Sequence, residues 1–199
     1  RFFRSRTACF PFRVCLAVIL VLALAPRISK TMASDAQKGG LSEYEIKAAY
    51  LYNFARFVEW PPELFADNQT PFSIAVLGND RLGAILDSTL QGKTVNNRRI
   101  TILHLKWPTD LKPYHIVFIG SSEPHLPQIM ESLQGVPVLT VTEAEVITHS
   151  KSVINLIVDD KKVRFEIDID KAEHSGLKIS SKLLMLARVF RNGKLDAVR

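Results

Sequence analysis

Short apolar runs alternate with helix-like segments along the middle of the chain, and this alternation limits the possible folds more than any other feature. Four runs of strand length are almost entirely apolar: 72–78, 99–105, 115–120 and 137–141. Between them, residues 82–90 and 126–133 carry leucine, isoleucine and methionine at helical spacing. Near-continuous apolar strands alternating with helices are typical of a mostly parallel sheet with helices on both faces. The sequence therefore predicts an α/β fold.

The C-terminal third begins with a different pattern. Residues 153–158 and 163–169 flank the polar segment Asp159–Lys162, which predicts a C-terminal antiparallel hairpin. Apolar and charged residues alternate strictly in the second run. The charged residues of that run are therefore expected on the solvent-exposed face of an edge strand: Arg164, Glu166 and Asp168.

A final helix is expected after this hairpin. Ser180 and Ser181 are suited to cap it, the helix would run through Phe190, and Gly193 would end it. Leucine and alanine occupy almost its whole circumference. Such a helix either lies in the centre of the core or is covered by a partner.

The first helix of the domain has a clear start and stop. Ser42 and Glu45 form a capping box, and Trp60-Pro61-Pro62 ends the segment. An aromatic and apolar stripe is expected to pack in the core: Ile46, Tyr50, Phe54 and Phe57. Residues off this stripe are candidates for contact with a partner: Tyr52, Arg56, Glu59 and Trp60.

The amino-terminal segment resembles a secretory signal peptide. Residues 14–25 form an uncharged apolar run of twelve residues, preceded by four arginines. A membrane-spanning helix needs roughly 20 such residues, whereas a basic start, a short apolar centre and small residues at the end indicate a cleaved leader. We predict a signal peptide at 1–33, a linker at 34–41, a single domain at 42–193 and a tail at 194–199. The cleavage point and a retained N-terminal anchor remain open.

Charge and cysteine content both change once this leader is set aside. The chain has a formal net charge of +6, but residues 1–33 contain six basic residues and no acid. The remainder has 20 basic and 20 acidic residues, which argues against nucleic-acid binding through bulk charge. Cys9 and Cys15 also lie in the leader. The mature domain is thus predicted to have no disulfide, thiolate metal site or cysteine nucleophile.

No motif for catalysis is found. The sequence contains no Gly-x-Ser-x-Gly, no His-Glu-x-x-His and no phosphate-binding Gly-x-x-x-x-Gly-Lys. The five histidines are scattered, without a pair at helical spacing: His104, His115, His125, His149 and His174. The sequence predicts a protein that is not an enzyme and holds no metal or cofactor.

Three loops are candidates for binding a small polar ligand. In a parallel sheet, ligands bind beyond the carboxyl ends of the strands, where helix N-termini offer free N–H groups. The residues expected at that edge are Gly78, Asn79, Asp80, Gly120, Ser121, Ser122, Thr142 and Glu143. Ordinary helix capping by Asn, Asp and Ser is the alternative explanation for the same residues.

Three stretches together resemble a known family. They are residues 48–61, residues 115–120, and residues 153–157 taken with 178–184. The chain resembles the YfiR family of exported bacterial proteins from about residue 44 to residue 191. The resemblance implies an α/β periplasmic protein that represses a membrane-bound diguanylate cyclase by binding its periplasmic sensor domain. Release of that repression raises cyclic-di-GMP and favours biofilm. The best-known member depends on disulfides, and this chain departs from it because its cysteines lie in the leader.

The leading hypothesis is a periplasmic regulator that docks on the sensor domain of a membrane signalling enzyme. Besides the last helix, the expected contact residues are Tyr52, Arg56, Glu59, Trp60, Asp159, Asp160, Lys161 and Lys162. The second hypothesis is a periplasmic small-molecule binding protein that uses the three loops. The partner's identity, the signal sensed and a homodimer are left open by the sequence.

Overall fold

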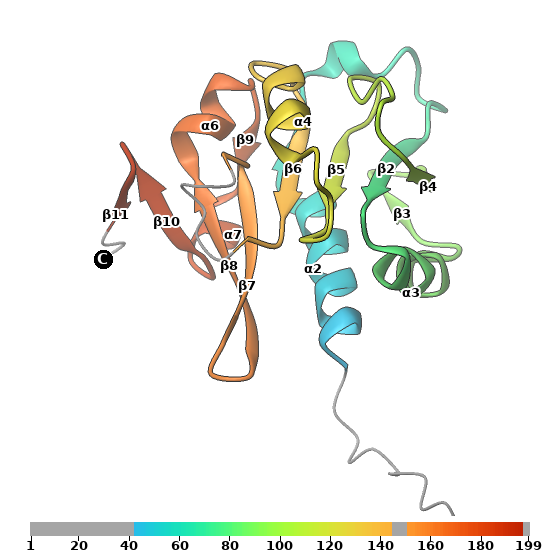
Figure 1. Cartoon of the computed structure of the whole chain (residues 1–199). Coiled ribbons are helices and arrows are strands. Elements are labelled where there is room, and N and C mark those ends of the chain that lie inside the picture. Colours follow the sequence, from blue (N-terminus) through green and yellow to red (C-terminus); the bar gives the residue numbers. More distant parts are fainter. Residues whose placement is uncertain (1–41, 145–150, 197–199) are drawn as a thin grey trace, which may run out of the picture. The chain divides into compact units, whose positions relative to one another are not determined.

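The computed structural model describes residues 42–144 and 151–196, which belong to one compact unit, Gly40–Arg199 (Figure 1). The predicted leader and linker lie outside the described residues. The helices are α2 (Glu43–Phe57), the 3-10 helix η2 (Pro62–Leu64), α3 (Asp80–Leu90), α4 (Leu126–Ser132), α6 (Ile169–His174) and α7 (Ser181–Leu184). The strands are β1 (Val58–Glu59), β2 (Phe72–Leu77), β3 (Thr94–Val95), β4 (Arg98–Leu105), β5 (Ile116–Ile119), β6 (Leu139–Thr142), β7 (Ile154–Asp159), β8 (Lys162–Asp168), β9 (Lys178–Ile179), β10 (Arg188–Arg191) and β11 (Lys194–Asp196).

Nine of these strands form one sheet in the order β11-β10-β8-β7-β6-β5-β2-β4-β3. Its centre is parallel, from β4 through β2, β5 and β6 to β7. The pairs β3–β4, β7–β8 and β10–β11 are antiparallel, and β10 is parallel to β8. A separate two-stranded sheet pairs β1 with β9. The predicted mostly parallel sheet with a C-terminal antiparallel hairpin is confirmed.

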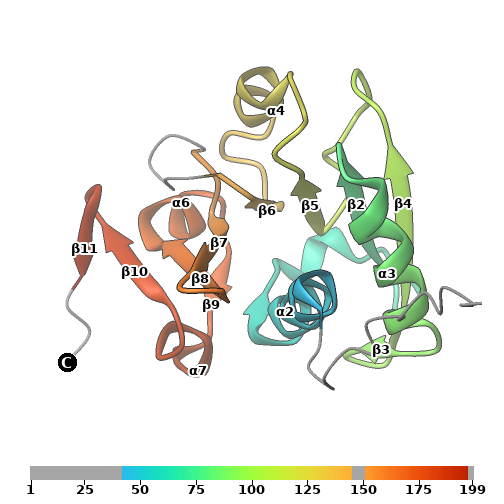
Figure 2. The same cartoon turned by 60° about the horizontal axis from the view of Figure 1, so that its bottom comes forward.

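Helices cover both faces of the central strands (Figure 2). On one face, strand residues such as Ile74 and Phe118 pack in the larger core with side chains of α2 and α3. Residues in between, such as Ala75 and Val117, point to the other face and pack with Ile129 of α4. Successive side chains of a strand point to opposite faces, so an apolar strand requires a cover on each.

Helix α2 begins at the predicted capping box. Ser42 Oγ accepts a hydrogen bond from Glu45 N at 3.3 Å, and the Glu45 carboxylate accepts one from Ser42 N at 2.6 Å. The fully buried line of the helix is shifted relative to the predicted stripe: Ala48, Leu51, Phe54 and Ala55. Tyr50 and Phe57 are only half-buried, because they pack at the margin of the core.

The predicted last helix is wrong beyond its first turn. Helix α7 ends at Leu184, and the chain then forms β10 and β11, which include part of the predicted tail. Asn192 and Gly193 have φ of 52° and 69°, the left-handed pair that a tight two-residue hairpin turn requires. Gly193 therefore belongs to a hairpin turn and does not end a helix.

Of the three charged residues of β8 that were predicted in solvent, Arg164 is exposed, and the prediction is wrong for the other two. Glu166 and Asp168 are only 8% and 6% exposed. Strand β10 pairs with β8 through Arg188↔Glu166 and Phe190↔Asp168, so β8 lies inside the sheet and not at its edge. Its predicted last residue, Ile169, instead begins α6.

Across residues 42–144 and 151–196, none of the helices combines the length and apolar character needed to cross a membrane.

Candidate functional site

The second half of α2 lies against the β3–β4 hairpin. The hydroxyl of Tyr52 donates a hydrogen bond to the carbonyl oxygen of Thr94 at 3.3 Å. The guanidinium of Arg56 lies 5.6 Å from the centroid of the Tyr52 ring, and the ammonium of Lys93 lies 4.9 Å from it. A cation near the face of an aromatic ring is attracted to the electron-rich π system of that ring. Tyr52 and Arg56, both predicted as partner contacts, thus form one surface with Thr94 of β3 and the preceding Lys93, which the sequence analysis missed.

Trp60 joins this surface to the interior. Its indole Nε1 donates a hydrogen bond to the carbonyl oxygen of His115 at 3.0 Å, and its ring packs edge-on against Phe72 at 4.9 Å. The side chain is half-buried, whereas the neighbouring Glu59 is exposed. Trp60 therefore anchors the end of β1 on the core and leaves only part of its side chain exposed.

A pocket of about 360 Å³ opens beside Trp60. Its lining residues are Val58, Glu59, Trp60, Pro62, Phe65, Phe72, Val95, Asn96 and Arg98. Arg98 is held in place by hydrogen bonds from Nη1 to the carbonyl oxygens of Asp67 at 2.6 Å and Thr70 at 2.9 Å. Its guanidinium also lies 4.1 Å from the centroid of Phe65. The lining of the pocket thus includes three aromatic side chains, one acidic side chain and one basic side chain.

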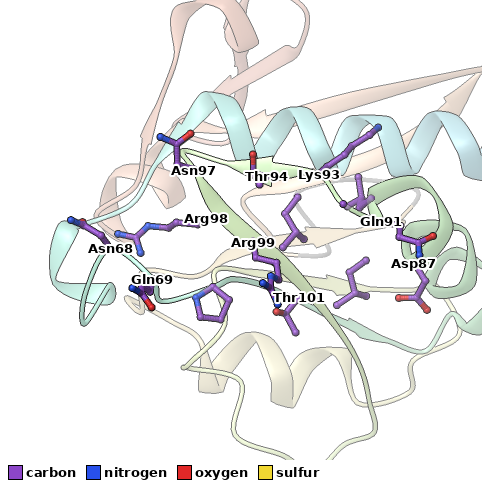
Figure 3. Close-up of a pocket in the computed structure, with 15 residues that line it drawn as sticks. Asn68, Gln69, Asp87, Gln91, Lys93, Thr94, Asn97, Arg98, Arg99 and Thr101 are labelled. Atoms are coloured by element: carbon purple, nitrogen blue, oxygen red, sulfur yellow. The ribbon is translucent and has the colours of Figure 1, made fainter.

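Arg98 also lines a larger, more polar pocket of about 900 Å³ (Figure 3). This pocket runs from Asn68 and Gln69 past Thr94 and Lys93 to Gln91 and Asp87 at the end of α3. Both pockets lie at the amino ends of β2 and β4. Together with Tyr52, Arg56 and Glu59 they form a continuous surface, which we call the α2–β3 surface.

His115 lies beneath this surface in an aromatic cluster. It is 3% exposed and stacks on Phe65 at 4.6 Å and on Phe72 at 4.7 Å. Ser73 N donates to its Nδ1 at 3.1 Å, which assigns the ring proton to Nε2, an atom with no hydrogen-bond partner in the structure. Burial, and to a smaller extent the nearby Arg98, lowers the pKa of His115 to about 4.

The predicted hairpin tip, Asp159–Lys162, lies elsewhere. It closes β7 and β8, which are in the half of the sheet away from β3 and β4 (Figure 1). Asp160 and Lys161 have φ of 50° and 61°, as a tight hairpin turn requires. Asp159 pairs with Arg188 at 2.5 Å and with Arg164 at 3.5 Å. The structure therefore does not bring the two predicted groups of partner residues together.

The three predicted ligand loops do meet at the carboxyl edge of the sheet, since β2, β5 and β6 are neighbours. The first two loops pack directly on each other. A Cβ atom on Gly120 would lie 2.7 Å from the carbonyl oxygen of Gly78, and one on Gly78 would lie 2.8 Å from Glu123 Cβ. Asn79 Oδ1 caps α3 by accepting a hydrogen bond from Leu82 N at 3.0 Å. The glycines thus permit close packing and Asn79 acts as a cap.

The other residues of these loops differ in accessibility. Asp80 is the first residue of α3. Ser121 and Ser122 are exposed, whereas Thr142 is 1% exposed and donates to Asn155 Oδ1 at 3.0 Å. Neither of the two pockets described above lies at this edge.

Glu143 pairs with Lys47, a buried residue of α2 that the sequence analysis missed. Lys47 Nζ lies 3.0 Å from Glu143 Oε1 and also pairs with Glu43. Burial alone would lower the pKa of Lys47, but the two carboxylates together hold it above its usual value. The pair ties the start of α2 to the end of β6. Among the residues that the structure describes, no cluster of His, Cys, Asp or Glu is arranged to hold a metal ion.

Comparison with known proteins identifies the family. The comparison with curated proteins finds no match. A solved structure, described as a conserved domain protein from Vibrio cholerae O1 biovar El Tor str. N16961, aligns with a TM-score of 0.48 and 12% identity over 75% of this chain. The alignment spans 60% of the length of that protein. A family model described as YfiR/HmsC-like matches residues 44–188. The match covers nearly all of the described domain, and the chain belongs to the YfiR/HmsC-like family.

Proposed function

We propose that this protein is a non-enzymatic periplasmic regulator that represses a membrane-bound diguanylate cyclase by docking on its periplasmic sensor domain. Membership of the YfiR/HmsC-like family supports a regulator of this signalling system. The repression, the docking and the export of the chain are our inferences.

The observation that carries the docking proposal is the α2–β3 surface. It combines concave pockets with aromatic and arginine side chains, the residue types most enriched at the centres of protein interfaces. Trp60 and Tyr52 are fixed by hydrogen bonds to the backbone, and Arg98 is fixed by two more. Side chains that are already ordered lose little conformational entropy on binding. The surface is therefore suited to recognise a folded protein domain.

Charge reversal on this surface tests the proposal. Deleting the gene is expected to raise cellular cyclic-di-GMP, and the wild-type gene should restore the low level. The double variant Arg56→Glu/Lys93→Glu should fail to restore it and should no longer capture a cyclase from detergent-solubilised membranes. Lys106→Glu is the matched control, because Lys106 is exposed beyond the other end of β4.

Two outcomes contradict the proposal. One is a cyclic-di-GMP level that does not change when the gene is deleted. The other is full complementation by the double variant, which would exclude the α2–β3 surface as the docking site.

Small-molecule binding at the carboxyl-edge loops remains the alternative. Its test is a thermal-shift screen of nucleotides, amino acids and vitamins against the wild type and Ser121→Ala/Ser122→Ala. Saturable stabilisation of the wild type alone would favour this alternative.

A further inference from the structure

Strand β4 has no partner strand along most of its outer side. Its inner side pairs with β2 as far as Leu105, but on its outer side β3 pairs only with Arg98 and Arg99. Within the described part of the chain, no other backbone hydrogen bond reaches residues 100–105. None of the residues of β4 is buried, whereas all but one of the residues of β2 are. This stretch of β4, at the right of Figure 2, is therefore an open edge of the sheet, which we call the β4 edge.

The turn before β4 determines which backbone groups point outward. The two turn residues, 96–97, have φ of 49° and 64°, as in a two-residue hairpin, so the flanking Val95 and Arg98 form a hydrogen-bonded pair. Neighbouring residues of a strand direct their N–H and C=O groups to opposite sides. Three residues therefore direct both groups away from β2, where the described chain supplies no strand: Ile100, Ile102 and His104.

The larger of the two pockets follows this edge. Five consecutive residues of β4 line it, from Arg98 to Ile102, although successive side chains of a strand point to opposite faces. A hollow that meets both sets of side chains lies along the margin of the strand. Its other walls are the end of α3 with residues 91–94, and the segment before β2 (Figure 3). Its volume of about 900 Å³ is typical of clefts that hold a ligand.

The side chains around the β4 edge are mainly basic. Lys93, Arg98 and Arg99 line the pocket, and none of them has an ion-pair partner among the described residues. The acidic residue of the lining, Asp87, contacts His104 Nε2 at 2.9 Å. Carboxylates on an incoming segment would therefore meet cations that have no other acidic partner.

We propose that the β4 edge binds an extended acidic segment of a partner protein, which adds to the sheet as a further strand. Backbone hydrogen bonds to the three outward residues hold such a segment, and its alternate side chains reach the basic lining. The inference rests on the proposed docking function and specifies how the partner contacts the α2–β3 surface.

A second copy of this chain is a poorer match for the same edge. The antiparallel register that uses all three outward residues is centred on Ile102. It would set Arg98 of each copy opposite Lys106 of the other, and like charges directly opposite each other destabilise a strand pair.

A synthetic peptide tests the proposal with the full chain. The probe is a short, fluorescein-labelled peptide of alternating valine and glutamate, and its binding is followed by fluorescence anisotropy. We expect saturable binding and slower amide hydrogen exchange at Ile100, Ile102 and His104. A peptide of valine and lysine should bind far more weakly. So should the acidic probe with every amide nitrogen methylated, because it keeps the charges but donates no backbone hydrogen bond.

Two variants separate backbone pairing from charge. Ile102→Pro removes an outward N–H without removing a bond to β2, and Arg99→Glu reverses an exposed charge. Each should weaken binding of the probe by roughly threefold or more. Leu195→Pro is the control for the proline, because Leu195 is exposed on the opposite margin of the sheet. If either proline variant fails to fold, the methylated probe still decides the question with the wild type.

Four outcomes would overturn strand addition. They are no binding of the acidic probe, equal binding of the methylated probe, binding without slower exchange at the β4 edge, and undiminished binding by both variants in their folded form. Slower exchange at this edge that grows with protein concentration, without peptide, would overturn it in favour of a second copy.

Cyclase capture distinguishes this inference from the docking proposal. If Ile102→Pro and Arg99→Glu still capture a cyclase from detergent-solubilised membranes and Arg56→Glu/Lys93→Glu does not, strand addition is overturned and the docking proposal stands. If the wild type captures none, the docking proposal fails, and the peptide experiment alone decides whether the β4 edge accepts a strand.

Discussion

His115 places a titratable ring inside an aromatic cluster, and this has a consequence for stability. Its pKa is about 4 in the folded protein, against an ordinary value of 6.5. At pH values between these two pKa values, His115 binds a proton in the unfolded chain but not in the folded chain. The free energy of unfolding therefore falls as pH drops from about 6.5 to about 4, by on the order of 3 kcal/mol in total.

The variant His115→Phe should remove most of this pH dependence. Phenylalanine keeps a ring between Phe65 and Phe72 but does not titrate. The hydrogen bond from Ser73 N to the histidine ring is lost at every pH. Urea unfolding at pH 7 and pH 5 measures the difference. The exposed His174 provides the control, and His174→Gln should retain the wild-type slope. An equal slope in His115→Phe and wild type would show that another group titrates.

Asn155 is the centre of a buried polar network. Its Oδ1 accepts from Thr142 Oγ1 at 3.0 Å and Ala144 N at 2.8 Å, and its Nδ2 donates to Ala144 O at 2.9 Å and Glu166 Oε2 at 3.3 Å. The isosteric variant Asn155→Asp would put a second carboxylate beside Glu166 and remove both donated bonds. We expect a loss of about 2 kcal/mol or more at pH 7, because an unpaired buried charge is costly.

The loss should shrink at pH 5, since crowding by Glu166 favours the protonated aspartic acid, which can donate again. Asn68→Asp at an exposed position should change stability by no more than a few tenths of a kcal/mol. If both variants behave alike in urea unfolding, the network contributes little to stability.

Among the secondary-structure elements, the β10–β11 hairpin depends on one glycine. Gly193 has φ of 69°, and a Cβ atom built on it would meet no heavy atom within 4 Å outside the glycine and its two chain neighbours. The variant Gly193→Ala should therefore lower the free energy of unfolding by about 1 kcal/mol through backbone conformation alone. Asn192→Gly, at the other left-handed position, should leave stability nearly unchanged. A helix ending at Gly193 would not give this contrast, because residue 192 would then be right-handed.

The central strands could be predicted because each is a continuous apolar run that must be buried on both faces. The last two strands could not be predicted from leucine and alanine content, because that content also suits a helix. The signal that was overlooked is the pair Asn192-Gly193, a strong marker of a two-residue hairpin turn. Glu166 and Asp168 were expected in solvent because they alternate with apolar residues along β8. Alternation shows which residues share a face of a strand, but it does not show whether another strand pairs with that strand, as β10 does with β8.

The candidate site was only partly predictable for a similar reason. Tyr52, Arg56 and Trp60 could be picked out as residues off the expected core stripe of α2. Their neighbours Lys93, Thr94 and Arg98 lie more than 30 residues away in sequence from each of them, and no local pattern marks them. Lys47 was missed because its partner, Glu143, follows the end of a strand that is distant in sequence.

For the whole molecule, we expect a chain that begins at Gly40 to fold without the preceding residues. The buried residues of the two core clusters that the structure describes lie between Ala48 and Leu183, so this chain keeps all of them. Circular dichroism should show a single cooperative unfolding transition. A chain that begins at Ala49 is the control, because it lacks the capping box, Lys47 and Ala48. If the longer chain also unfolds gradually, earlier residues contribute to the fold.

Strands β3 and β11 form the two margins of the nine-stranded sheet, and both are short. β3 has two residues, with the carbonyl oxygen of Thr94 already bonded to the Tyr52 hydroxyl. β11 has three residues, two of them charged, Lys194 and Asp196. A long, flat, apolar margin would act as a template on which further molecules could stack into fibres. Because both margins are short and carry polar residues, we expect the folded protein to resist such polymerisation at high concentration.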